Sequence, residues 1–121
     1  MHIEDNLINQ QLIEAALRRR SNVELHTAST GEQGLATVAA LSPDLVLLDL
    51  HLTDMVGGDV LRQLKTADEF PVPAVVVVSA DANLEQINTI IALGADHYLT
   101  KPLDLEALYA VIDRLTVDRR T

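Results

Sequence analysis

The chain contains no cysteine among its 121 residues. It therefore has no disulfide framework, no thiolate metal ligand and no cysteine nucleophile, which suits a reducing compartment. On this basis we expect a cytoplasmic location. Aromatic residues make up only 2% of the chain, which argues against a site that packs aromatic side chains against a flavin ring.

Basic residues and long apolar runs are also scarce. Lys and Arg total 9 against 18 Asp and Glu, and the formal net charge is -9. Nucleic-acid binding relies on clustered Lys and Arg, so we expect no direct contact with nucleic acid. No apolar run approaches the roughly 20 residues that span a bilayer, and the N-terminus lacks a signal-peptide pattern. We expect a soluble protein without membrane contact.

What the sequence does contain is a regular alternation of aliphatic runs with segments of helical period. Its length and its 48% apolar content suit one domain, covering residues 1–121. Aliphatic runs that predict strands occupy residues 1–3, 23–28, 44–50, 72–80 and 96–100. Strands that are apolar on both faces and alternate with helices are typical of a parallel sheet covered on both sides. We therefore predict a doubly wound α/β fold of five strands, the first of them short.

The intervening segments carry helix signals. Residues 7–20 have apolar residues at helical spacing after Asn6, a good cap, and the predicted buried face is Ile8, Leu12, Ala15 and Ala16. Ser29 and Glu32 have the spacing of a capping box for a second helix that ends near Leu41. Three further helices are predicted after residues 58, 83 and 104, each with an apolar stripe.

Polar residues follow the predicted strands at the points where they end. Glu4 and Asp5 follow the first strand, Asp49 nearly ends the third, Ser79 ends the fourth, and Lys101 follows the fifth. In open parallel α/β sheets, ligands bind at the carboxyl ends of the strands. We therefore expect these five side chains to converge on one rim of the sheet.

Three neighbouring carboxylates need a compensating charge, because like charges raise one another's pKa. A hard divalent cation supplies it, and we expect Mg²⁺, or Mn²⁺ in its place, with Asp5 and Asp49 as direct ligands and Glu4 acting through a bound water. A carboxylate beside a metal and an ammonium can act as a nucleophile and form an aspartyl phosphate. Asp49 is the candidate nucleophile, with Lys101 and Ser79 contacting the phosphoryl oxygens.

These residues resemble the receiver domains of two-component response regulators, chemotaxis regulators among them. The resemblance covers almost the whole chain and rests on four stretches in order: "IEDN" at 3–6, "DLVLLDLHLTDMVGGDVL" at 44–61, "VVVVSAD" at 75–81 and "GADHYLTKPLD" at 94–104. It implies a flavodoxin-like (βα)5 fold with strand order 2-1-3-4-5. It also implies bacterial phosphorelay signal transduction, in which a histidine kinase or a phosphotransfer domain is the phosphate donor.

The resemblance also implies roles for individual residues. Asp49 would be the phosphoacceptor, and the backbone carbonyl of His51 would join the metal ligands. Ser79 would be the switch hydroxyl, Lys101 would precede a cis Pro102, and Tyr98 would turn inward on activation. The downstream protein would then bind the face formed by the fourth helix, fifth strand and fifth helix. The only chemistry implied is self-catalysed phosphorylation and dephosphorylation of the aspartate, without turnover of an external metabolite.

The sequence departs from the family pattern at several positions. A proline is usual where Thr53 stands, so we expect a less rigid loop after Asp49. His51 and Asp81 occupy variable positions that tune the rates of phosphate gain and loss. The family has several more apolar residues before the acidic pair, so we expect an excised domain or a chain start set too late. The origin stays open between a stand-alone regulator and the receiver of a hybrid sensor histidine kinase, whose parent protein would be a kinase.

Two other functions fit parts of the pattern. A degenerate receiver would bind proteins without phosphate, but the acid, hydroxyl and lysine positions are all filled here. A haloacid-dehalogenase-like phosphatase also uses a strand-end aspartate, but it needs a second aspartate two residues later, where His51 stands. The sequence therefore favours a phosphorylated receiver.

Overall fold

Five parallel strands form a single sheet in the order β2-β1-β3-β4-β5. The structure, a computed structural model, describes residues 1–117 apart from residues 21–22, 53, 55, 69 and 82. The strands are β1 (His2–Ile3), β2 (Thr27–Ala28), β3 (Leu45–Asp49), β4 (Ala74–Ser79) and β5 (His97–Thr100). The predicted α/β class, the strand order and the short first strand are confirmed.

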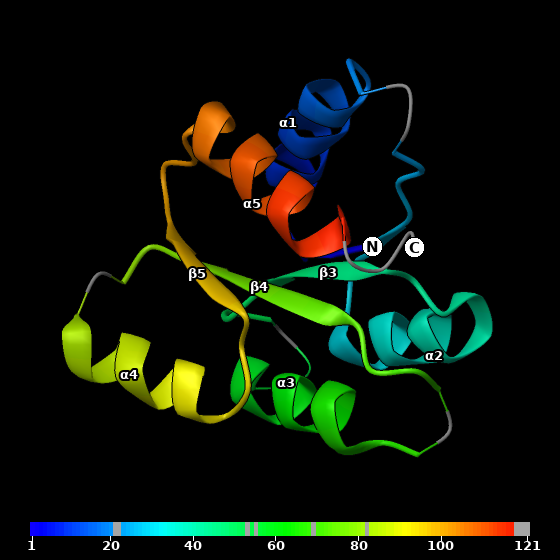
Figure 1. Cartoon of the computed structure of the whole chain (residues 1–121), viewed down its shortest axis with the longest axis vertical. Coiled ribbons are helices and arrows are strands. Elements are labelled where there is room, and N and C mark those ends of the chain that lie inside the picture. Colours follow the sequence, from blue (N-terminus) through cyan, green and yellow to red (C-terminus); the bar gives the residue numbers. More distant parts are fainter. Residues whose placement is uncertain (21–22, 53, 55, 69, 82, 118–121) are drawn as a thin grey trace.

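Five helices cover the two faces of this sheet. They are α1 (Leu7–Leu17), α2 (Gly31–Leu41), α3 (Gly57–Thr66), α4 (Leu84–Ala92) and α5 (Leu105–Val117). Helices α1 and α5 lie together on one face, and α2, α3 and α4 lie on the other (Figure 1). Within the part of the chain that the structure describes, no helix combines the length and apolarity needed to cross a bilayer.

The two central strands, β3 and β4, are buried on both faces because helices cover both sides of the sheet. Their side chains alternate between two apolar clusters. Val46, Leu48, Val75 and Val77 pack toward α2, α3 and α4, whereas Leu45, Leu47, Val76 and Val78 pack toward α1 and α5. Full burial of one such side chain contributes about 1.5–3 kcal/mol, so these strands form a rigid platform for the residues at their ends.

The predicted buried face of α1 was mostly wrong, since of its four residues only Ala16 is buried. Ile8 and Leu12 are 67% and 62% exposed, and Ala15 is exposed as well. The helix buries Gln10, Ile13 and Leu17 together with Ala16. The predicted cap is confirmed, because the Asn6 side chain accepts a hydrogen bond from the Asn9 N–H. Both faces of α1 carry aliphatic residues, and the polar Gln10 is tolerated inside because its amide donates to the Glu4 carbonyl and to Ser29 Oγ.

Two other local predictions were displaced. Helix α2 is capped by Thr30, which accepts from the Gln33 N–H, and the Gln33 side chain accepts from the Ser29 N–H. The capping pattern therefore lies one residue later than predicted. Strand β2 pairs only over Thr27–Ala28 instead of the predicted residues 23–28, because its partner β1 has only two residues.

Candidate functional site

Asp49 is the last residue of β3 and sits at the rim where the strands end. Its side chain is held among buried aliphatic neighbours and is 4% exposed. Its backbone pairs with Val78 of β4, and its Oδ1 accepts a hydrogen bond of 3.1 Å from the His51 N–H. The rigid strand therefore fixes the backbone of Asp49, and the His51 N–H of the following turn fixes the orientation of its carboxylate.

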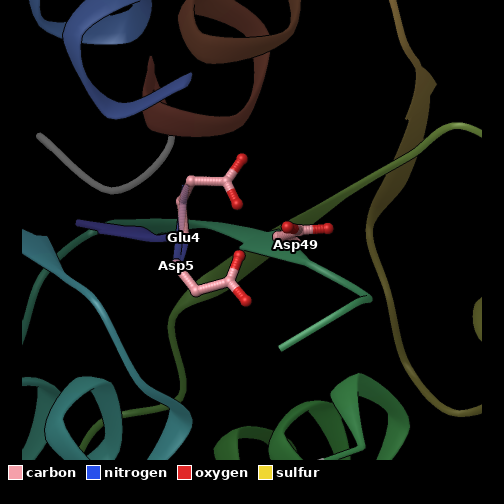
Figure 2. A group of neighbouring side chains, drawn as sticks. All are labelled: Glu4, Asp5 and Asp49. Carbon is pink, nitrogen blue, oxygen red and sulfur yellow. The ribbon is translucent and has the colours of Figure 1, made fainter. Parts of the chain in front are cut away.

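Glu4 and Asp5 follow β1 directly and reach the same rim. Figure 2 shows their side chains extending toward the end of β3, where Asp49 lies. One carboxylate oxygen from each of the three residues lies within 4.8 Å of the other two. Glu4 is 2% exposed, whereas Asp5 is half-buried. The predicted convergence of the three acidic residues is therefore present in the structure.

Lys101, beyond β5, completes the cluster. Its Nζ lies 3.3 Å from Glu4 Oε1 and 3.6 Å from Asp49 Oδ2. The peptide bond between Lys101 and Pro102 is cis, as the resemblance implies, and the Lys101 N–H donates to the Ser79 carbonyl. One ammonium thus faces two buried carboxylates, with Asp5 close by, so the described cluster has an excess of negative charge.

That excess is expressed in the titration of Glu4. Burial raises the pKa of Glu4, and both its hydrogen bond with Asp49 and the charge of Asp49 raise it further, while the Lys101 ammonium opposes the shift. The physical cause is the cost of placing two like charges together away from water. A divalent cation would remove this cost.

The donor set fits such a cation. Three carboxylates supply only oxygen atoms, which Mg²⁺ and Mn²⁺ favour, and the partial exposure of Asp5 leaves room for metal-bound waters. The side chain of His2, which lies on β1 two residues before Glu4, is buried, and burial lowers the pKa of His2 to about 4. The imidazole is therefore neutral at neutral pH, and it adds no positive charge to the site.

Ser79 and Tyr98 lie on the neighbouring strands. Ser79 is fully buried at the end of β4, and its Oγ accepts from the Asp81 N–H. The Tyr98 hydroxyl donates to the Asp81 carbonyl at 2.8 Å. Asp81 therefore connects both residues to the segment that leads into α4, where Asn83 caps the helix.

Two further predicted positions, His51 and Thr53, follow Asp49 in the sequence, and the structure describes only the first of them. The His51 side chain is exposed, and the contact of His51 with the cluster is made by its backbone N–H, which donates to Asp49 Oδ1. Thr53, with the predicted loss of loop rigidity, lies outside the described residues.

Sequence reasoning missed Gln10, whose side-chain amide donates to the Glu4 carbonyl at 2.5 Å and to Ser29 Oγ at 3.1 Å. Its signal was a polar residue three positions before Ile13, on the same helical face.

Comparisons with known proteins agree along nearly the whole chain. Residues 1–113 match the family model described as the response regulator receiver domain. The cell cycle transcriptional regulator CtrA of Caulobacter vibrioides is 36% identical over 110 residues, which are 91% of this chain and 46% of that protein. The chain thus spans about half the length of the curated relatives it matches.

Solved structures give the same picture. The receiver domain of NtrX from Brucella abortus superposes with a TM-score of 0.84 at 27% identity, covering 94% of each chain. The chemotaxis protein CheY4 of Vibrio cholerae superposes equally well, with a TM-score of 0.84 at 20% identity and 94% of each chain covered. The second likeness supports the fold alone.

Proposed function

This chain belongs to the response regulator receiver domain family of two-component signalling, and we propose that it accepts a phosphoryl group on Asp49 in a Mg²⁺-dependent reaction. The observation that carries the proposal is the cluster itself: Glu4, Asp5 and Asp49 within 4.8 Å, with Lys101 3.6 Å from Asp49. Receiver domains interact with histidine kinases or phosphotransfer proteins, so the donor would be a phosphohistidine.

In the proposed reaction, a carboxylate oxygen of Asp49 forms a bond to phosphorus while the phosphorus–nitrogen bond of the phosphohistidine breaks. The leaving imidazole keeps the electron pair of that bond and takes up a proton. Lys101 would balance charge on the transferring phosphoryl oxygens, and the Ser79 hydroxyl would donate to one of them. When bound, a divalent cation supplies further positive charge at these oxygens.

Asp5 and Asp49 would hold the cation directly, together with the backbone carbonyl of His51, and Glu4 would act through a bound water. The raised pKa of Glu4 is consistent with a site that is short of positive charge before the cation binds. The exposed side chains of His51 and Asp81 would tune the rates of phosphate gain and loss, because the backbone N–H of each residue donates to a side chain of the site, Asp49 and Ser79 respectively.

Phosphorylation would be read out on the face formed by α4, β5 and α5. The Ser79 Oγ is bound to the Asp81 N–H and the Tyr98 hydroxyl to the Asp81 carbonyl, so one short segment connects both residues to α4. The Ser79 Oγ only accepts in this contact, so its hydroxyl hydrogen is free to donate to the phosphoryl group, and a rotation of Ser79 toward that group would weaken its bond with the Asp81 N–H. A downstream protein, and not nucleic acid, would recognise the result, because the chain carries a net charge of -9.

The test is labelling with acetyl phosphate and Mg²⁺, followed by intact mass measurement and peptide mapping. We expect one phosphoryl group on the wild type, located on the peptide that contains Asp49, and none on Asp49→Asn. The matched control is Asp59→Asn, which removes an exposed carboxylate in the first turn of α3 and should label as the wild type does. A folded wild type that gains no phosphoryl group would refute the proposal and favour a degenerate receiver.

A further inference from the structure

Asp54, in the connection between β3 and α3, binds the start of a different helix. Its Oδ1 accepts a hydrogen bond of 2.8 Å from the Gly31 N–H, and its Oδ2 accepts one of 3.0 Å from the Glu32 N–H. These are the first two residues of α2, whose N–H groups have no partner within the helix. A carboxylate at a helix N-terminus also interacts favourably with the helix dipole.

Helix α2 does not depend on Asp54 for a local cap. Thr30 already accepts from the Gln33 N–H, and the Gln33 side chain returns the contact to the Ser29 N–H. Glu32 supplies a first-turn acid from within the helix. The bidentate contact from Asp54 has a different effect from these local caps. It joins α2 to the segment that follows β3, the strand that ends in Asp49.

The connection between β3 and α3 is also held by backbone hydrogen bonds close to Asp49. His51 and Val56 form an isolated antiparallel bridge, and the Gly57 N–H donates to the Leu50 carbonyl at 3.2 Å. Asp54 stands between the two bridge partners in the sequence. The backbone of His51 is thus constrained by Val56 and by Asp49, whose Oδ1 accepts the His51 N–H.

We propose that Asp54 is a positioning residue for the acidic site: by fastening the β3–α3 connection to the first turn of α2, it holds the His51 backbone in place for the metal. The inference rests on the proposed function, in which the His51 carbonyl is a metal ligand. Groups that orient ligands from outside the coordination shell commonly control metal affinity. Asp54 acts one step further out, through the backbone.

The experiment compares Mg²⁺ binding by calorimetry for wild type, Asp54→Ala, Asp54→Asn and Asp59→Ala, without any phosphodonor. Circular dichroism first establishes a temperature at which each protein is fully folded. We expect the dissociation constant of Asp54→Ala to rise about tenfold. Asp54→Asn should rise less, because one amide oxygen can still accept one of the two N–H groups. Asp59→Ala, which removes a half-exposed acid at the start of α3, should stay at the wild-type value.

Hydrogen exchange of the Gly31 and Glu32 amides in the metal-free proteins tests the contact itself. Both amides should exchange faster in Asp54→Ala than in wild type and Asp59→Ala. Unchanged exchange would overturn the inference, and so would faster exchange with an unchanged Mg²⁺ affinity. These results leave the proposed function standing, whereas a wild type that binds no Mg²⁺ would overturn both.

Discussion

Lys101 and Glu4 are 97 positions apart in the chain, yet Lys101 Nζ lies 3.3 Å from Glu4 Oε1. Lys101 follows the edge strand β5, and Glu4 follows β1 near the other side of the sheet, with β3 and β4 between them. The lysine side chain therefore crosses the rim and passes Asp49 at 3.6 Å. This ion pair connects the two ends of the site across its centre.

Replacing Lys101 by Met should slow phosphorylation by acetyl phosphate about 100-fold, because one preorganised charge at a developing oxyanion contributes roughly that factor. The metal-free variant should also be less stable than wild type, since Glu4 and Asp49 lose their shared counter-charge. Initial labelling rates at saturating Mg²⁺ and urea unfolding without Mg²⁺ measure the two effects. Lys101→Arg should retain more stability than Lys101→Met. Equal labelling rates for wild type and Lys101→Met would contradict the assigned role.

The raised pKa of Glu4 predicts a pH dependence of the metal-free protein. The folded protein keeps the Glu4 proton at pH values where the unfolded chain, with an ordinary value near 4.5, has lost it. The contribution to stability is therefore full below pH 4.5 and is lost as the pH rises through the raised pKa of Glu4. Glu4→Gln should remove this loss and be more stable than wild type at pH 7.

Urea unfolding of both proteins between pH 4 and 8, without metal, measures the difference. His2, with its lowered pKa, contributes the opposite slope. The Glu4 charge partly opposes that lowering, so Glu4→Gln also alters the His2 contribution, and the measured difference belongs to the Glu4–His2 pair. The same variant should bind Mg²⁺ about tenfold more weakly, as expected for a residue that acts through bound water. A difference in stability that is constant across this pH range would show that Glu4 ionises normally.

The Tyr98 hydroxyl offers a clean deletion with a matched control. Tyr98→Phe removes its hydrogen bond to the Asp81 carbonyl, and Tyr109→Phe removes a comparable bond from α5 to the Ala16 carbonyl of α1. Each should lower the free energy of unfolding by about 1 kcal/mol. Labelling of Asp49 should be unaffected in both.

The two variants should differ in their response to beryllofluoride and Mg²⁺. In wild type and in Tyr109→Phe we expect hydrogen exchange to change at the start of α4, because the segment around Asp81 is released or tightened when Ser79 moves. In Tyr98→Phe that change should be smaller. An identical response in all three proteins would exclude Tyr98 from the switch.

The fold could be predicted because aliphatic runs and helical periods determine the order of elements, and the strand order then follows from the family pattern. The acidic site was also predictable, since residues at the ends of parallel strands must share a rim. The buried face of α1 was not, because Ile8 and Leu12 have the right period but face solvent. Periodicity identifies a helix without identifying which of two apolar faces meets the sheet.

Contacts between segments that are far apart in the chain could not be predicted from the sequence either. Gln10 and Asp54 each hold backbone groups from another element, and neither has a sequence signal that names its partner. A polar residue on a helical face that also carries Ile13 indicates only that some buried partner exists. Its identity depends on how α1 lies against the end of β1, which local sequence does not determine.

Two adjacent glycines at the start of α3 differ in the space that a side chain would have. A Cβ on Gly57 would lie 2.6 Å from both the Cα and the carbonyl oxygen of Leu50, which are backbone atoms of the segment after Asp49. A Cβ on Gly58 would meet only Leu93 Cδ1, at an ordinary 3.6 Å. Gly57→Ala should therefore destabilise the protein by about 2 kcal/mol through overpacking, whereas Gly58→Ala should stabilise it by about 0.5 kcal/mol through helix propensity.

The displaced backbone in Gly57→Ala is that of Leu50, directly before His51, so the variant should also bind Mg²⁺ more weakly than Gly58→Ala. Chemical unfolding and calorimetric Mg²⁺ titration of both variants measure the two effects. The pair differs by one position and by no side-chain chemistry, so a difference in stability larger than the helix-propensity effect reflects the close approach of α3 to the segment after β3. Equal stabilities for the two variants would show that Leu50 can move away without cost, and the loop geometry inferred for the metal site would then be too rigid.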